Sequence, residues 1–113
     1  SPLTVEILRD RNALYRVAAE GVIENSYGVK LINKTAETMT YRIVVETDSA
    51  VSLPNDELVV DVPPEELLSL PVTLSAPEGA VKGREEVRFV IERVGGDRPV
   101  RVIQDAAFFA PVN

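Results

Sequence analysis

The hydrophobic positions of this chain recur mainly at every second residue, in short runs separated by turn residues. Residues 3–7 alternate apolar and polar side chains, and the same alternation returns in residues 68–74 and 87–91. A period of two is typical of a strand with one buried face. Further strands are expected over residues 27–31, 40–47, 51–53, 57–62 and 100–109. No segment shows a sustained helical period.

Turn chemistry separates these runs and indicates how they connect. Pro63-Pro64 and Gly95-Gly96 each end a strand, and residues 81–86 are expected to cross as a loop. Pro71 lies inside an alternating run, which favours an edge strand or a bulge because proline cannot donate a ladder hydrogen bond. Seven or eight short strands predict an all-β fold, an immunoglobulin-like antiparallel β-sandwich. The length fits one domain, residues 1–113.

The composition removes most chemistry from consideration. The chain has no histidine and no cysteine, so it lacks the usual neutral-pH acid/base group and the usual ligands of zinc or iron–sulfur clusters. Eighteen acidic and twelve basic residues give a net charge of −6, and no basic patch suits nucleic acid. We therefore expect no catalytic residue, no metal, no nucleic-acid partner and no small-molecule substrate.

Two pairs of adjacent glutamates are candidates for paired catalytic carboxylates, Glu65-Glu66 and Glu85-Glu86. Neighbouring residues of a strand point to opposite faces, so neither pair can flank one substrate bond, and surface charge is the expected role. A calcium site would have to draw on scattered carboxylates that lack the spacing of a dedicated loop. Asn33-Lys34-Thr35 fits a glycan acceptor, but the position favours turn geometry.

The stretch from residue 8 to residue 24 breaks the strand pattern and carries the main cluster of basic residues, in which Asp10 and Glu20 are interspersed. A solvated turn with local ion pairs is the commoner structure for such a cluster. The alternative is a docking surface for a neighbouring domain or a lipid headgroup. The residues of this candidate docking surface are Arg9, Asp10, Arg11, Asn12 and Arg16.

The same stretch carries a resemblance to a known family. The chain reads LRDRNALYR and then GVIENSYGVKLINKT, which resembles the C-terminal immunoglobulin-like domain of the FixG/CcoG family, the cytochrome c oxidase accessory proteins. Members typically carry Arg-Asp-Arg-Asn after the first strand, followed by Glu-Asn-x-Tyr and a strand that ends in Asn-Lys. The second group of motif residues here is Glu24, Asn25, Tyr27, Asn33 and Lys34.

The resemblance implies a setting for the domain. FixG-like proteins are multi-pass inner-membrane proteins whose cytoplasmic part binds two [4Fe–4S] clusters through cysteines, and they support assembly of the cbb-type oxidase through copper handling. The domain would then lie on the periplasmic face, excised from a larger membrane protein because the chain begins at Ser1 rather than Met. Its partner would be the membrane portion of the same protein or an oxidase-assembly protein.

Two other functions stay open at this point. A generic bacterial immunoglobulin-like module could serve as a spacer or adhesive in a secreted or surface protein. A small carbohydrate-binding or ion-binding sandwich would need exposed aromatic residues or a carboxylate cluster, and the chain has no tryptophan and only three tyrosines and three phenylalanines. An enzyme is the least favoured class.

Overall fold

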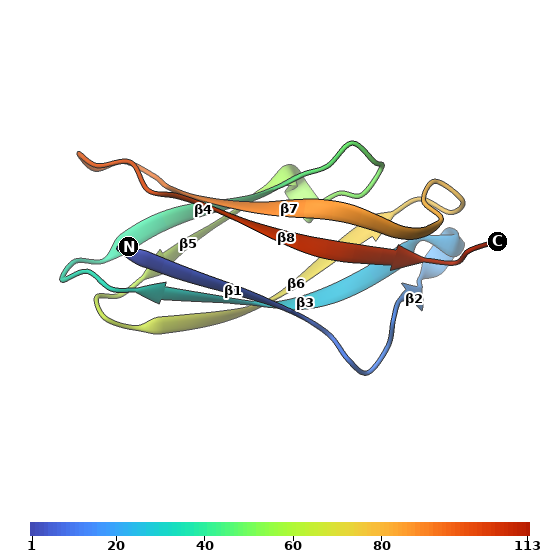
Figure 1. Ribbon diagram of the computed structural model, residues 1–113, viewed down its shortest axis with the longest axis horizontal. Coiled ribbons are helices and arrows are strands. Elements are labelled where there is room, and N and C mark those ends of the chain that lie inside the picture. Colours follow the sequence, from blue (N-terminus) through green and yellow to red (C-terminus); the bar gives the residue numbers. More distant parts are fainter.

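Eight strands form two antiparallel sheets in the computed structural model, which describes all residues, Ser1–Asn113 (Figure 1). This arrangement confirms the predicted all-β sandwich. Two single turns of 3₁₀ helix, Ala19–Gly21 and Pro54–Asp56, are the only helical segments, and neither could cross a membrane. The first sheet contains β1 (Leu3–Arg9), β2 (Arg16–Val17), β3 (Ile23–Asn33) and β6 (Leu67–Ala76), and the second contains β4 (Met39–Glu46), β5 (Leu58–Val62), β7 (Gly83–Arg93) and β8 (Arg101–Ala110).

The central strand of the first sheet is β3. It pairs with β6 along one side, and with β1 and then β2 along the other. The second sheet has the order β5-β4-β7-β8. Pro71 lies in β6, whose far side carries only the isolated bridge between Ser52 and Ser75, so the predicted edge position is confirmed.

The core fills the space between the sheets and follows from the alternation in the sequence. Every second residue of β3, from Ile23 to Asn33, is buried. The inward residues of both sheets form one cluster of 21 buried side chains, in which the rings of Tyr27 and Phe89 meet edge to face at 5.3 Å. Burial of each large apolar side chain stabilises the fold by about 1.5–3 kcal/mol. Aliphatic and aromatic packing replaces the disulfide of antibody domains.

Some predicted boundaries were wrong. The strand expected from residue 27 begins at Ile23, and the loop expected over residues 81–86 ends early because β7 begins at Gly83. The reason is backbone pairing with β8, which continues to Ala110 whatever the polarity of the side chains. Residues 51–53 make one bridge rather than a strand, although Val51 and Leu53 are buried.

The structure also resolves the faces of the last strand. Phe108 is fully buried and Phe109 is half-buried, as expected for adjacent residues of which one must point outward. Ala106 and Val102 share the inward side with Phe108 and pack against the core. The odd-numbered residues of β8 therefore face away from the core.

Candidate functional site

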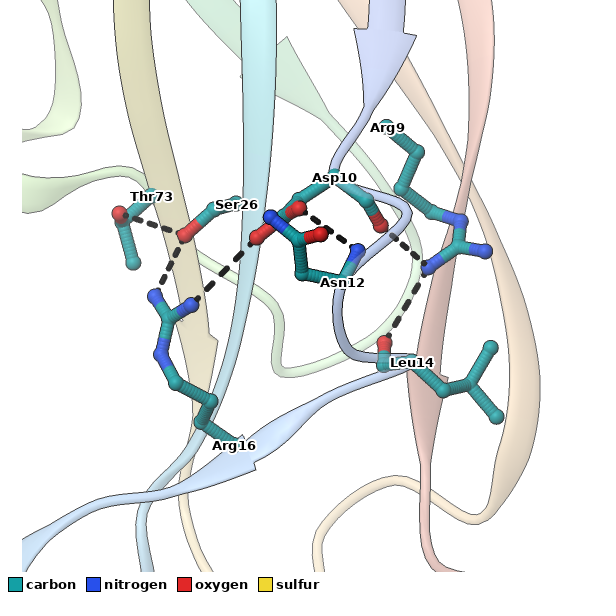
Figure 2. Close-up of polar contacts among 7 residues, drawn as sticks. All are labelled: Arg9, Asp10, Asn12, Leu14, Arg16, Ser26 and Thr73. Atoms are coloured by element: carbon teal, nitrogen blue, oxygen red, sulfur yellow. Dashed lines mark hydrogen bonds and ion pairs between the residues drawn. The ribbon is translucent and has the colours of Figure 1, made fainter.

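The predicted docking residues lie where the chain leaves the first sheet and returns to it. Strands β1 and β2 pair with the same side of β3, and residues 10–15 bulge away between them (Figures 1 and 2). The N–H of Asp10 donates to the carbonyl of Ser26 at 2.8 Å, and the Oδ1 of Asp10 accepts the N–H of Asn12 at 2.9 Å. This short-range turn is a common use of aspartate, and it gives the bulge a defined shape.

Arg9 holds this bulge against the other sheet. Its guanidinium carbon lies 4.7 Å from the ring centroid of Phe109 in β8, within the range of a cation–π contact. The same guanidinium donates to the carbonyl oxygens of Asp10 and Leu14, each at 3.4 Å (Figure 2). Arg9 is therefore engaged inside the domain.

Arg16 closes the bulge from its other end. Its Nη2 donates to the hydroxyl of Ser26 at 2.5 Å, and its Nη1 lies 3.7 Å from a carboxylate oxygen of Asp10 (Figure 2). The hydroxyl of Ser26 also lies 3.3 Å from that of Thr73 in β6. Local ion pairing, the commoner structure for this cluster, is thus what the domain shows. Because this pair is on the surface, it contributes at most about 1 kcal/mol.

Arg11 is the one arginine of the cluster that forms no hydrogen bond and no ion pair, and it is exposed. With Ile7, Leu8 and Arg9 it lines a shallow hollow beside the bulge. Leu8 is 45% exposed and Leu14 is 50% exposed. The surface available to a partner is therefore Arg11 with the exposed Leu8 beside it, a smaller and more apolar surface than the sequence indicated.

Two of the predicted family residues join the sheets to each other. The Asn25 side chain accepts the N–H of Phe109 and donates to its carbonyl, both at 2.8 Å. It thereby makes the two hydrogen bonds that a neighbouring strand would make. The hydroxyl of Tyr27 donates to the carbonyl of Ala107 at 2.8 Å. Burial raises the pKa of that hydroxyl, and the charge of Arg9 opposes the rise.

Asn33 organises the loops at the other end of β3. Its Oδ1 accepts the backbone N–H of Thr35 at 2.9 Å and the hydroxyl of Thr35 at 2.7 Å. Its Nδ2 lies 2.8–3.1 Å from the carbonyl oxygens of Glu37, Val62 and Pro63. The side chain is completely buried. The turn role predicted for this asparagine is confirmed, and the buried amide is unsuited to a glycan.

The acidic pairs do not converge. The carbonyl of Glu66 accepts the N–H of Asn33 at the Ser1 end of the sandwich, whereas Glu85 pairs with Phe108 near the opposite end. Glu57 is engaged with Arg42 at 3.0 Å, and Asp61 accepts the hydroxyl of Thr40 at 2.7 Å. No group of three or more potential metal ligands is present. The acidic residues are distributed as surface charge.

The comparison with known families decides where this chain belongs. Residues 1–111 match a family described as "IG-like fold at C-terminal of FixG, putative oxidoreductase". The chain belongs to this family. The FixG-related protein of Vibrio parahaemolyticus, whose crystal structure is known, superposes with a TM-score of 0.78 at 29% identity, over 96% of each chain.

Two longer relatives of this FixG-type domain are known from their sequences. Protein RdxB of Cereibacter sphaeroides is 34% identical over 114 residues, which cover 96% of this chain and 24% of RdxB. Nitrogen fixation protein FixG of Rhizobium meliloti is 27% identical over 92 residues, 74% of this chain and 18% of that protein. The chain thus spans about a quarter or less of either relative. An Escherichia coli alpha-2-macroglobulin, 16% identical with a TM-score of 0.66 over 97% of this chain and 17% of its own, shares the fold alone.

Within the FixG-type domain, the second group of motif residues divides by face. Asn25, Tyr27 and Asn33 point inward and make buried hydrogen bonds. Glu24 lies on the outward face of β3, and Lys34 is exposed, with its backbone N–H bonded to the carbonyl of Pro2. The sequence alone did not separate these roles. The alternation along β3 could have done so, since it places the two asparagines and the tyrosine on the buried side.

Proposed function

We propose that this chain is a non-catalytic, periplasmic interaction domain of a FixG-like iron–sulfur membrane protein that supports cbb-type cytochrome c oxidase assembly and copper handling. Its partner is an oxidase-assembly protein or the membrane portion of its own parent. Two [4Fe–4S] clusters of that parent would be held by cysteines outside this chain, which has none. Membership of the FixG family supports this proposal over a generic spacer or adhesive module.

The observation that carries the proposal is the split between engaged and free residues. The inward side chains of Asn25, Tyr27 and Asn33 are consumed in hydrogen bonds that hold the fold, and the paired carboxylates lie apart. What remains for function is a surface, on which Arg11 offers a cation beside the exposed apolar side chain of Leu8. Such a combination suits a protein contact better than a chemical step.

The geometry favours a separate assembly protein over the membrane portion as the occupant of this surface. The family description puts the fold at the C-terminal part of FixG, so the rest of such a parent would join the domain ahead of β1. Strand β1 is seven residues long and carries the chain about 20 Å away from that junction before the bulge begins (Figure 1). A position early in the sequence is therefore not a position beside the junction.

The test is charge reversal in the full-length parent. We expect Arg11→Glu to lower the amount of assembled cbb-type oxidase several-fold while the parent itself accumulates normally, because a repulsive charge replaces the one free arginine of the surface. Arg98→Glu, at an exposed position in the β7–β8 loop, is the matched control and should leave assembly unchanged. Arg9→Glu is a poorer probe, since it would also break the contact with Phe109.

Deletion of the whole domain distinguishes a wrong assignment of Arg11 from a wrong proposed function. If removal of residues 1–113 lowers assembly but Arg11→Glu does not, the domain acts through another surface and the assignment of Arg11 is wrong. If removal of the domain leaves assembly and copper-dependent activity intact, the proposed function itself is wrong and the domain is a spacer.

A further inference from the structure

We propose that the free edge of β8 pairs with the same edge of a second copy of this chain, in an antiparallel twofold arrangement centred on Ile103. The two four-stranded sheets β5-β4-β7-β8 would join into one continuous sheet. This inference rests on the register of the second sheet and is independent of the function proposed above.

The alternation of the backbone shows which groups of β8 are free. The N–H of Arg93 donates to the carbonyl of Val100 at the start of the β7–β8 pairing. The even-numbered residues of β8 therefore turn their backbone N–H and C=O groups toward β7. The odd-numbered residues Ala107 and Phe109 turn theirs away, toward Tyr27 and Asn25. Arg101, Ile103 and Asp105 are also odd-numbered, so their backbone N–H and C=O groups point away from β7. No strand pairs with that side of β8.

The free stretch is therefore short and bounded. It begins at Arg101, the first residue of β8, and ends where the Tyr27 and Asn25 side chains occupy the edge. The outer edge of β6, by contrast, carries two features that block pairing, Pro71 and the bridge at Ser75.

The outward side chains of the second sheet form three rows whose order follows from the strand register. Arg42 of β4 lies opposite Glu92 of β7, which lies opposite Arg101 of β8. The next row contains only apolar residues, and the third contains acidic, basic and acidic residues in turn. The rows are Arg42–Glu92–Arg101, Val44–Val90–Ile103 and Glu46–Arg88–Asp105.

A twofold pairing centred on Ile103 extends each row without a conflict. Arg101 would lie opposite the second copy's Asp105, and Asp105 opposite the second copy's Arg101, so that the charges alternate across six strands, β4, β7 and β8 of each copy. Ile103, which is 41% exposed, would pack against its own copy and lengthen the apolar row. A shift of the pairing register by two residues would place Ile103 opposite the second copy's Arg101, and the charge pairs and the apolar pair would be lost.

Because the edge of β8 is complementary to itself, a second copy of this chain is the partner that fits it. A twofold interface must offer the same patch on both partners, and a segment with a basic end, an apolar centre and an acidic end meets that requirement when it runs antiparallel to itself. Asp105 also borders a hollow whose charged lining is one arginine, Arg88, and four further carboxylates, so the excess negative charge favours an incoming arginine; the carboxylates are those of Glu46, Asp48, Glu85 and Glu86. The ladder is short, so the dimer is expected to be weak and concentration-dependent.

Sedimentation equilibrium of the 113-residue chain over a concentration series into the millimolar range tests the pairing. We expect a monomer–dimer equilibrium, with Ile103→Lys raising the dimer Kd about tenfold or more because two lysines would face each other at the centre. Val59→Lys is the matched control. Val59 is a 52% exposed valine on β5, the opposite edge strand of the same sheet, and its replacement should leave the Kd unchanged.

Charge exchange tests the register. Arg101→Glu and Asp105→Arg should each weaken the dimer about tenfold, since each places like charges opposite one another twice. The double variant should restore dimerisation, because opposite charges face each other again, while thermal unfolding shows that each variant is folded. A chain that stays monomeric at every concentration overturns the proposal. So does a dimer that survives Ile103→Lys, or a double variant that dimerises no better than the single ones.

Discussion

The hydrogen bonds between Asn25 and Phe109 make a strong prediction about stability. Asn25 is 2% exposed, and its side chain makes hydrogen bonds to both the N–H and the carbonyl of Phe109. Asn25→Ala removes both bonds. The alanine is too short to restore either bond. We therefore expect this single change to loosen the contact between β3 and β8 without altering the pairing inside either sheet.

The size of the loss follows from two bonds at 2.8 Å. A typical bond contributes about 0.5–1.5 kcal/mol net, and a buried partner left unpaired costs about 1–3 kcal/mol. Because water can reach half-buried Phe109, we expect a loss of about 3 kcal/mol in the free energy of unfolding. For 113 residues this corresponds to a Tm lowered by about 12 °C.

Urea unfolding and thermal melting measure this loss directly. Asn12→Ala is the matched control, since Asn12 is exposed and its side-chain amide makes no hydrogen bond, and its stability should stay within about 0.5 kcal/mol of the original chain. Amide hydrogen exchange adds a local measurement, because the N–H of Phe109 should lose protection in Asn25→Ala. A loss below about 1 kcal/mol, with Phe109 still protected, would refute the reasoning.

The two buried tyrosines give the remaining predictions. Tyr41→Phe should stabilise the domain by about 1 kcal/mol in urea unfolding, because the buried hydroxyl of Tyr41 has no hydrogen-bond partner, and a destabilised variant would contradict this. Burial raises the pKa of both Tyr27 and Tyr41 above the ordinary value of 10.0, so the unfolded chain releases its phenolic protons first and stability should fall as the pH rises above about 10. The double variant Tyr27→Phe with Tyr41→Phe should flatten that alkaline fall, and an unchanged pH slope would show that other groups cause it.

Much of the fold could be predicted because one face of each strand is buried and the other is not. The alternation in β1, β6 and the middle of β7 gives those strands directly. The ends are harder to predict, because pairing depends on the partner strand. The β7 segment from Gly83 to Glu86 is polar and is a strand only because β8 lies beside it. Strand β2 is two residues long and is likewise defined by its partner, β3.

The candidate site was predictable in composition but not in arrangement. Alternating charges in residues 9–16 indicate local ion pairs, and the pair between Arg16 and Asp10 is one. The contact of Arg9 with Phe109 joins the two ends of the chain, so no local pattern reports it. The same holds for Asn25 and Phe109, 84 residues apart. Only a polar side chain at an inward position of β3 hints that a distant partner exists.

The motif residues predicted from the family resemblance and the residues free to act are therefore largely different. Asn25, Tyr27 and Asn33 satisfy buried backbone groups, so their loss would destabilise the fold and obscure any effect on a partner. A search for function by mutation should leave them intact. The informative positions are Arg11, which has no internal partner, and Ile103, which lies on the edge of β8 that no strand pairs with through backbone hydrogen bonds. They test separate surfaces, because Arg11 lies on the bulge of the first sheet and Ile103 on the outer edge of the second. Loss of oxidase assembly with dimerisation unchanged would assign function to the bulge, and the reverse would assign self-association to the edge.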